Sequence, residues 1–270
     1  MKKILGFMII TCMLVFVLTG CEKEENKNSI SNTTSTSKNI SNTNNKNTSN
    51  TSTKNNTSKE ESKVVVDYEE AAKKQMAKPE AGETVATIHI KNFGDVKVKF
   101  FDDVAPKAVE NFVTHAKEGY YDGVTFHRVI NEFMIQGGDP LGNGTGGESI
   151  WGTDFAEELD PELVPYRGSL CMASRGLQNS PSLGSQFFIT QANYDEQMSQ
   201  TMQTYGYPSD LLEQYKNYGG YLSLYQQYTV FGQVYEGMEV VDKIAKVETD
   251  ANDKPVEDVI IEKIDVTTME

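Results

Sequence analysis

The chain has 270 residues and a formal net charge of −14. Residues 1–63 hold nine lysines and five acids, so residues 64–270 carry a net charge of −18. This acidic body argues against nucleic acid and anionic lipid surfaces as partners, because both select basic proteins. We interpret the acidity as a means of keeping a secreted domain soluble. The three scattered histidines do not suggest a metal site, so no metal is expected.

The N-terminus has the features of a targeting segment. Two lysines precede the apolar residues 4–18, a run of 15 residues that is shorter than the roughly 20 residues needed to span a bilayer. A short apolar run with a basic flank is typical of a signal peptide, here residues 1–20. Its end, from Leu18 to Cys21, resembles a bacterial lipobox. The resemblance implies cleavage before Cys21 and lipidation of that cysteine, and plain secretion with an unmodified Cys21 is the alternative.

Residues 26–59 are of low complexity. Of these 34 residues, 27 are Asn, Ser or Thr and five are Lys. Such a segment buries too little apolar area to offset its ordering entropy, so we expect residues 21–63 to form a disordered tether. A flexible coil of about 60 residues has a root-mean-square span near 45 Å. We therefore expect a domain held at the extracytoplasmic face of a cell membrane, and the compositional bias suggests a Gram-positive cell.

A charged linker is predicted at residues 64–83, with a helix around residues 68–78 outside the core. From residue 84 to residue 270 the composition is that of a globular domain. Cys171 is the only cysteine in this part, so an internal disulfide is not available. Its apolar neighbours favour a buried, inert thiol over a catalytic nucleophile.

The folded part has alternating apolar runs typical of strands and two amphipathic helices. Strands are predicted at residues 84–91, 96–101, 124–130, 134–137, 169–173, 186–190, 229–233 and 256–266, and helices at residues 106–119 and 238–245. Pro106 suits the first turn of its helix, and Gly119 suits the end. This pattern predicts a mainly β fold, a closed antiparallel barrel capped by two α-helices. Because side chains fill such a barrel, ligands are expected on its outer wall.

Residues 193–221 form an insertion rich in Tyr and Gln, with breaks at Pro208, Gly219 and Gly220. Residues 209–218 are predicted to be helical, and the insertion is expected beside the pocket. A lid that grips substrate and a passive surface decoration both remain open.

Polar side chains on apolar strands indicate a shaped pocket. Arg128 lies in the run Phe126 to Ile130, and Gln136 and Gln186 lie in two further apolar runs. An arginine on such a strand usually faces a ligand or a carboxylate. A salt bridge to a surface acid is the alternative interpretation for Arg128.

Five motifs resemble, in order, the signatures of the cyclophilins. They are Phe126 to Ile130, Phe133 to Asp139, Gly144 to Gly147, Gly184 to Ile189, and Val230 to Gly232. The resemblance covers residues 85–266. It implies an eight-stranded barrel with two capping helices and peptidyl-prolyl cis-trans isomerase activity on X–Pro bonds, without a cofactor or metal.

The resemblance also implies roles for individual residues. Arg128 would donate to the proline nitrogen as rotation makes it more basic, and Gln136 would order the arginine and contact substrate. The remaining substrate-binding positions are Phe133, Met134, Gly144, Ala173, Gln186, Phe188, Leu224 and Tyr228. By strand alternation Phe126, Phe187 and Phe231 belong to the core, and His127 is given a structural role.

The sequence departs from the family on one side of the pocket. Ser223 stands where many relatives carry a large ring, and Tyr228 stands where they carry a histidine. Tyrosine still offers a ring and a hydroxyl, but not a group that protonates near neutral pH. Ser174 replaces a usual asparagine.

The leading hypothesis is a lipid-anchored foldase whose partners are unfolded or nascent secreted polypeptides that contain proline. The alternative is a cyclophilin-like module or chaperone that binds proline segments with little or no turnover. The retained Arg128, Gln136 and Phe188 favour the enzyme, whereas Ser223 and Tyr228 favour the binding module.

Overall fold

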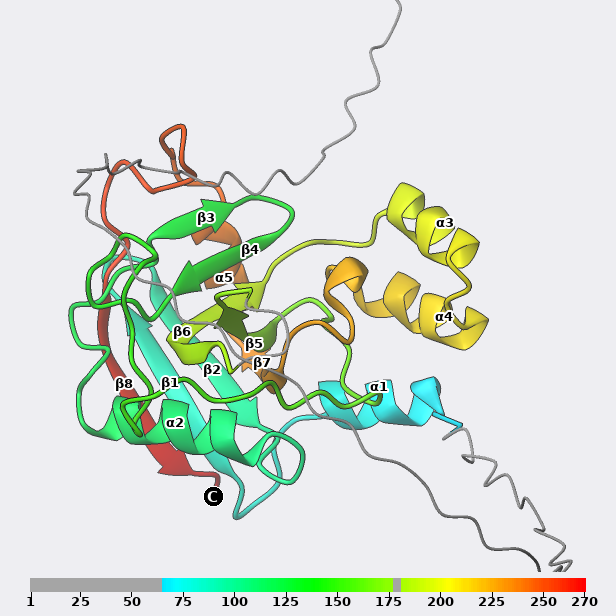
Figure 1. The fold of residues 1–270 in the computed structure, drawn as a ribbon, viewed down its shortest axis with the longest axis horizontal. Coiled ribbons are helices and arrows are strands. Elements are labelled where there is room, and N and C mark those ends of the chain that lie inside the picture. The colour runs from blue at the N-terminus through cyan, green and yellow to red at the C-terminus, as the bar shows by residue number, and fades with distance from the viewer. Residues whose placement is uncertain (1–64, 177–180) are drawn as a thin grey trace, which may run out of the picture. The chain divides into compact units, whose positions relative to one another are not determined.

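The computed structural model describes residues 65–176 and 181–270. The predicted signal peptide, tether and lipidation site lie outside the described residues. The strands are β1 (Thr84–Ile90), β2 (Gly94–Phe100), β3 (Arg128–Ile130), β4 (Met134–Gly137), β5 (Ser169–Ser174), β6 (Leu183–Thr190), β7 (Val230–Glu236) and β8 (Ile261–Thr268). They form one curled sheet in the order β3-β4-β6-β5-β7-β2-β1-β8 (Figure 1).

Every neighbouring pair in this sheet is antiparallel. The mainly β fold with eight antiparallel strands is therefore confirmed. Near the two end strands, the amide of Phe126 donates to Val259 O at 2.9 Å and that of Ile261 to Val124 O at 2.8 Å. These contacts join the ends of a half-barrel through single bridges, and a closed barrel stays a prediction.

Two predicted strands are shorter than expected. The segment predicted at residues 124–130 is a regular strand only at Arg128–Ile130, because Thr125 makes isolated bridges to two different partners, Asp139 and Ile260. The last strand begins at Ile261 and not at residue 256.

One large apolar cluster fills the concave side of the sheet. Phe126, Phe187 and Phe231 are fully buried in it, so their predicted core positions are confirmed. Cys171 is also fully buried, and burial raises the pKa of its thiol well above the ordinary value. The prediction of a buried thiol is therefore confirmed.

Two helices cover the ends of this cluster, as predicted. The helix α2 (Pro106–Lys117) buries Val109 and Phe112 against the sheet, and α5 (Met238–Ile244) buries Val240, Val241 and Ile244. No side chain of α2 caps its own N-terminus; the carboxylate of Glu158 accepts the amides of Lys107 and Ala108 at 3.2 and 2.9 Å. A distant carboxylate thus satisfies two of the free N–H groups there.

The described residues form three α-helices in addition to the two that cap the predicted barrel. They are α1 (Tyr68–Met76), α3 (Glu196–Thr204) and α4 (Ser209–Tyr218), followed by the 3₁₀ helix Leu222–Leu224. The helix predicted at residues 209–218 is confirmed. The side chains of Tyr166, Leu211 and Tyr215 belong to a second apolar cluster that joins α4 to α1. Among the residues that the structure describes, no helix has the length and hydropathy needed to cross a bilayer.

The placement of residues 68–78 outside the core is wrong, although the helix itself is confirmed. Tyr68, Ala71, Ala72 and Gln75 lie on one face of α1 and are buried. Gln75 Nε2 donates to Val164 O at 2.7 Å and to two further oxygens, and its Oε1 accepts the amide of Val164 at 3.1 Å. Because the burying face mixes small and polar residues, the apolar periodicity that would have revealed it is weak.

The buried amide of Gln75 predicts a measurable loss of stability. Gln75→Ala removes its hydrogen bonds and leaves Val164 and its neighbours with unsatisfied polar groups. The free energy of unfolding should fall by about 2–3 kcal/mol in chemical denaturation. Lys74→Ala, an exposed change on the same helix, is the matched control. Equal stability of the two variants would show that α1 is not docked as described.

Candidate active site

A groove of about 650 Å³ lies on the face of β3, β4 and β6 opposite the core. Its volume falls in the range of ligand sites, about 300–1,000 Å³. Nine of the ten predicted catalytic and substrate-binding residues line it: Arg128, Phe133, Met134, Gln136, Gly144, Ala173, Phe188, Leu224 and Tyr228. The tenth, Gln186, lines an adjoining hollow of about 90 Å³ that shares Gln136, Gly144 and Ala173 with the groove.

Arg128 and Gln136 face this groove together, as predicted. They are opposite one another in the antiparallel register of β3 and β4, and paired residues project from the same face of a sheet. Arg128 Nε also lies 3.5 Å from Asp253 Oδ2, and the two side chains are 43% and 44% exposed. The sequence left two alternatives for Arg128, a place in the groove and an ion pair at the surface. In the structure both occur together.

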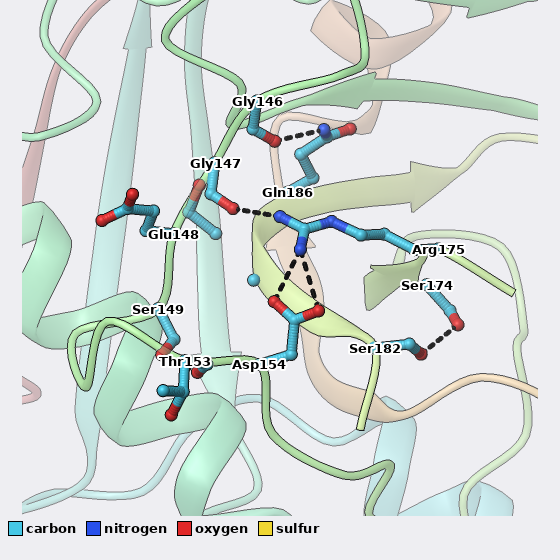
Figure 2. Close-up of polar contacts among 12 residues, drawn as sticks. Gly146, Gly147, Glu148, Ser149, Thr153, Asp154, Ser174, Arg175, Ser182 and Gln186 are labelled. Carbon is cyan, nitrogen blue, oxygen red and sulfur yellow. Dashed lines mark hydrogen bonds and ion pairs between the residues drawn. The ribbon is translucent and has the colours of Figure 1, made fainter. Parts of the chain in front are cut away.

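A chain of amide hydrogen bonds fixes the orientation of Gln136. Its Nε2 donates to Gln186 Oε1 at 2.9 Å. Gln186 Nε2 in turn donates to Gly144 O at 3.1 Å. It also donates to Gly146 O at 2.8 Å (Figure 2). Because Gln136 joins this chain through one N–H of its amide nitrogen, its carbonyl oxygen is an acceptor that the chain does not use.

The floor of the groove is apolar. Met134, Phe188 and Leu224 are 2%, 5% and 8% exposed and belong to one small cluster, against which Phe133 packs partly buried. The ring of Phe188 meets that of Tyr228 edge to face, with 5.5 Å between their centroids. This floor can take a ring or an aliphatic side chain that leaves water.

The segment from Ser223 to Tyr228, which departs from the family pattern, contributes fewer residues to the groove than the sequence suggested. Ser223 is not among the lining residues, and its carbonyl accepts a hydrogen bond from Gln227 Nε2 at 2.7 Å. Tyr221 does not line the groove either, and its ring packs against that of Phe133 with 4.3 Å between the centroids. No residue of α3 or α4 lines the groove.

The glycine-rich segment of the groove is organised by Asp139. Burial raises the pKa of this carboxyl, but backbone donors outweigh that effect and hold the pKa below its ordinary value. The amides of Leu141, Asn143 and Gly144 donate to it at 2.8, 3.2 and 2.7 Å. Gly144 has a φ of +85°, and an added Cβ would lie 3.6 Å from His127 Nε2. The positive φ therefore favours glycine at this position, whereas the space around it would accept a Cβ.

An ion pair borders the smaller hollow. Arg175 Nη1 donates to both carboxylate oxygens of Asp154 at 2.7 and 2.8 Å, and its Nη2 donates to Gly147 O at 2.7 Å (Figure 2). Close by, the hydroxyls of Ser174 and Ser182 lie 2.7 Å apart. Ser174 itself lines the groove.

Sequence reasoning missed several lining residues. Asp250, Asn252 and Lys254 come from one turn before β8, and Asn143 comes from the glycine-rich segment. Only the tertiary fold brings this turn beside Arg128. His127, given a structural role, is 6% exposed and also lines the groove, and burial lowers its pKa.

Comparisons with known proteins agree on the family. A sequence model described as cyclophilin type peptidyl-prolyl cis-trans isomerase/CLD matches residues 85–266. A protein of Staphylococcus epidermidis RP62A, named as a peptidyl-prolyl cis-trans isomerase, is 51% identical over 65% of this chain and 88% of its own length. A protein of the same description from Staphylococcus aureus USA300 is 47% identical over 68% of this chain and 92% of its own.

Solved structures are similar to the same part of the chain. A cyclophilin type peptidyl-prolyl cis-trans isomerase of Cryptosporidium parvum has a TM-score of 0.57 and 34% identity, covering 70% of this chain and 99% of its own. The same protein in the presence of the dipeptide Ala-Pro has a TM-score of 0.54 and 34% identity, covering 69% of this chain and 98% of its own. The chain therefore belongs to the cyclophilin-type peptidyl-prolyl cis-trans isomerases.

Proposed function

We propose that this isomerase acts outside the cell membrane, on X–Pro bonds of secreted and surface polypeptides, from a lipid anchor at Cys21. The observation that carries the chemistry is Arg128 on the wall of a groove whose floor is apolar. The observation that supports the location is the signal-peptide pattern of residues 1–20 followed by a polar tether.

The groove suits the demands of the rotation. An X–Pro bond turns over a barrier of about 18–20 kcal/mol, and rotation breaks the resonance that keeps the amide planar. The proline nitrogen then becomes more basic, so a donor aimed at it stabilises the twisted state more than the planar one. Arg128 supplies that donor, and no covalent intermediate is formed.

The floor and the amide chain hold the substrate while its bond turns. Phe133, Met134 and Phe188 receive the proline ring. A relative that has been solved in the presence of the dipeptide Ala-Pro supports a substrate of this kind. Gln136, held by Gln186, contacts the substrate backbone. Extended segments of unfolded chains fit such a groove best, because a folded proline-containing loop rarely exposes backbone on both sides of the ring.

A proline-binding module with little turnover is the second candidate. The observation in its favour is the altered segment from Ser223 to Tyr228, of which Leu224 and Tyr228 line the groove. A change of wall alters how tightly substrate is held, whereas the donor at Arg128 governs the chemical step. The two candidates are therefore separated by turnover and not by binding.

Arg128→Ala should lower kcat/KM for an X–Pro peptide by about 100- to 1,000-fold, as loss of one transition-state donor does elsewhere. The measurement is cis-to-trans relaxation catalysed by the full chain purified in detergent. Lys97→Ala, which removes an exposed cation on β2, is the control. No acceleration by the unmutated chain, with peptide binding intact, would favour the binding module.

Cys21→Ala should release the protein from the membrane into the medium of the producing cells, because lipidation needs the cysteine thiol. Immunoblots of the membrane fraction and of the medium measure the distribution. Cys171→Ala is the matched control, since that buried thiol takes no part in anchoring. Retention of the Cys21→Ala protein at the membrane would contradict a lipid anchor.

A further inference from the structure

Asp253 is the charged neighbour of Arg128 that the sequence did not reveal. Its Oδ2 lies 3.5 Å from Arg128 Nε, and its carbonyl oxygen accepts the amide of Val129 at 2.8 Å. The first contact is an ion pair, longer than a direct hydrogen bond. The second fixes the backbone of Asp253 to the residue that follows Arg128.

The turn that carries Asp253 is held by several hydrogen bonds within it. The carboxylate of Asp250 accepts the amides of Asn252 and Lys254 at 2.8 and 3.0 Å, and the amide of Asp250 donates to Lys254 O at 2.8 Å. Asp253 itself has a φ of +64°, a left-handed conformation that Asp and Asn tolerate better than most residues. The backbone from which its carboxylate extends is therefore held by contacts within the turn.

The contact at Nε leaves the reactive end of the arginine available. A guanidinium is a rigid planar fork, and Nε is the nitrogen next to the aliphatic stem. A carboxylate at Nε orients the plane of the fork without occupying its two terminal nitrogens. An arginine without such a partner samples many rotamers, only some of which aim a donor into the groove.

The ion pair between Arg128 and Asp253 contributes little to the stability of the fold. Both side chains are more than two-fifths exposed, where solvent and salt screen their attraction. For the same reason, the carboxylate neutralises only a small part of the charge that Arg128 offers to a ligand. Orientation of the guanidinium is the effect that remains.

We propose that Asp253 is a positioning residue of the isomerase, which holds Arg128 with its terminal nitrogens toward the groove. The inference rests on the proposed role of Arg128 as the donor to the proline nitrogen. Asp253 does not line the groove itself, unlike its neighbours Asn252 and Lys254. It acts on substrate only through the arginine.

The test is Asp253→Asn in the full chain, because asparagine keeps the left-handed backbone and removes the charge. We expect kcat/KM for an X–Pro peptide to fall by about 10- to 100-fold, as misplacement of a reacting group does. Affinity for the peptide, measured by titration calorimetry, and the melting temperature should stay close to those of the unmutated protein. Asp258→Asn, an exposed change five residues on with the same loss of charge, should leave kcat/KM unchanged.

A double-mutant cycle identifies the route of the effect. In an Arg128→Ala background, Asp253→Asn should cause no further loss, since the residue it positions is gone. A further loss in that background, an unchanged kcat/KM in Asp253→Asn alone, or an equal fall in Asp258→Asn would each overturn the inference. If Arg128→Ala itself retains full activity, the proposed role of Arg128 fails first, and the two failures are thereby distinguished.

Discussion

The pairing of β4 between β3 and β6 is the constraint on which the groove depends. In this register Gln136 lies opposite Arg128 on one neighbour and opposite Phe188 on the other. Val129 and Ile135, the alternate residues, are buried in the core. A shift by one residue would send the polar side chains into the core and the apolar ones to the groove. Burial of the core thus selects which side chains can meet a substrate.

The second apolar cluster extends this constraint to the far wall. Tyr68 of α1 places its hydroxyl 3.0 Å from that of Tyr225, which also donates to Pro161 O at 2.9 Å. Tyr225 directly follows Leu224, a lining residue of the groove. The helix nearest the predicted tether therefore packs against the turn that carries one wall of the site. The packing of α1 therefore affects the geometry of the groove as well as the stability of the fold.

The sequence was informative where side-chain periodicity is strong and where motifs are long. The strands β1, β2, β4 and β6 and the helix α2 follow from alternation and from Pro106, and nine predicted site residues do line one groove. It was uninformative for Asp253, because an ion pair between residues 125 positions apart leaves no local pattern. It predicted the helix α1 but placed it wrongly outside the core, because Gln75 is buried by hydrogen bonds that are visible only once Val164 and Gln233 are placed. Local patterns identify elements, and long-range polar contacts escape them.

The two sides of the groove bear differently on rate and on specificity. In its proposed role, Arg128 would interact with a nitrogen whose basicity exists only while the bond is twisted, so its contribution would be to the transition state. Leu224 and Tyr228 line the groove, where in the proposed function they would meet parts of a substrate that do not change during rotation. Contacts of that kind bind ground state and transition state equally and change KM more than kcat. Replacement of the family's histidine by Tyr228 on this wall is therefore compatible with the chemical step proposed for Arg128.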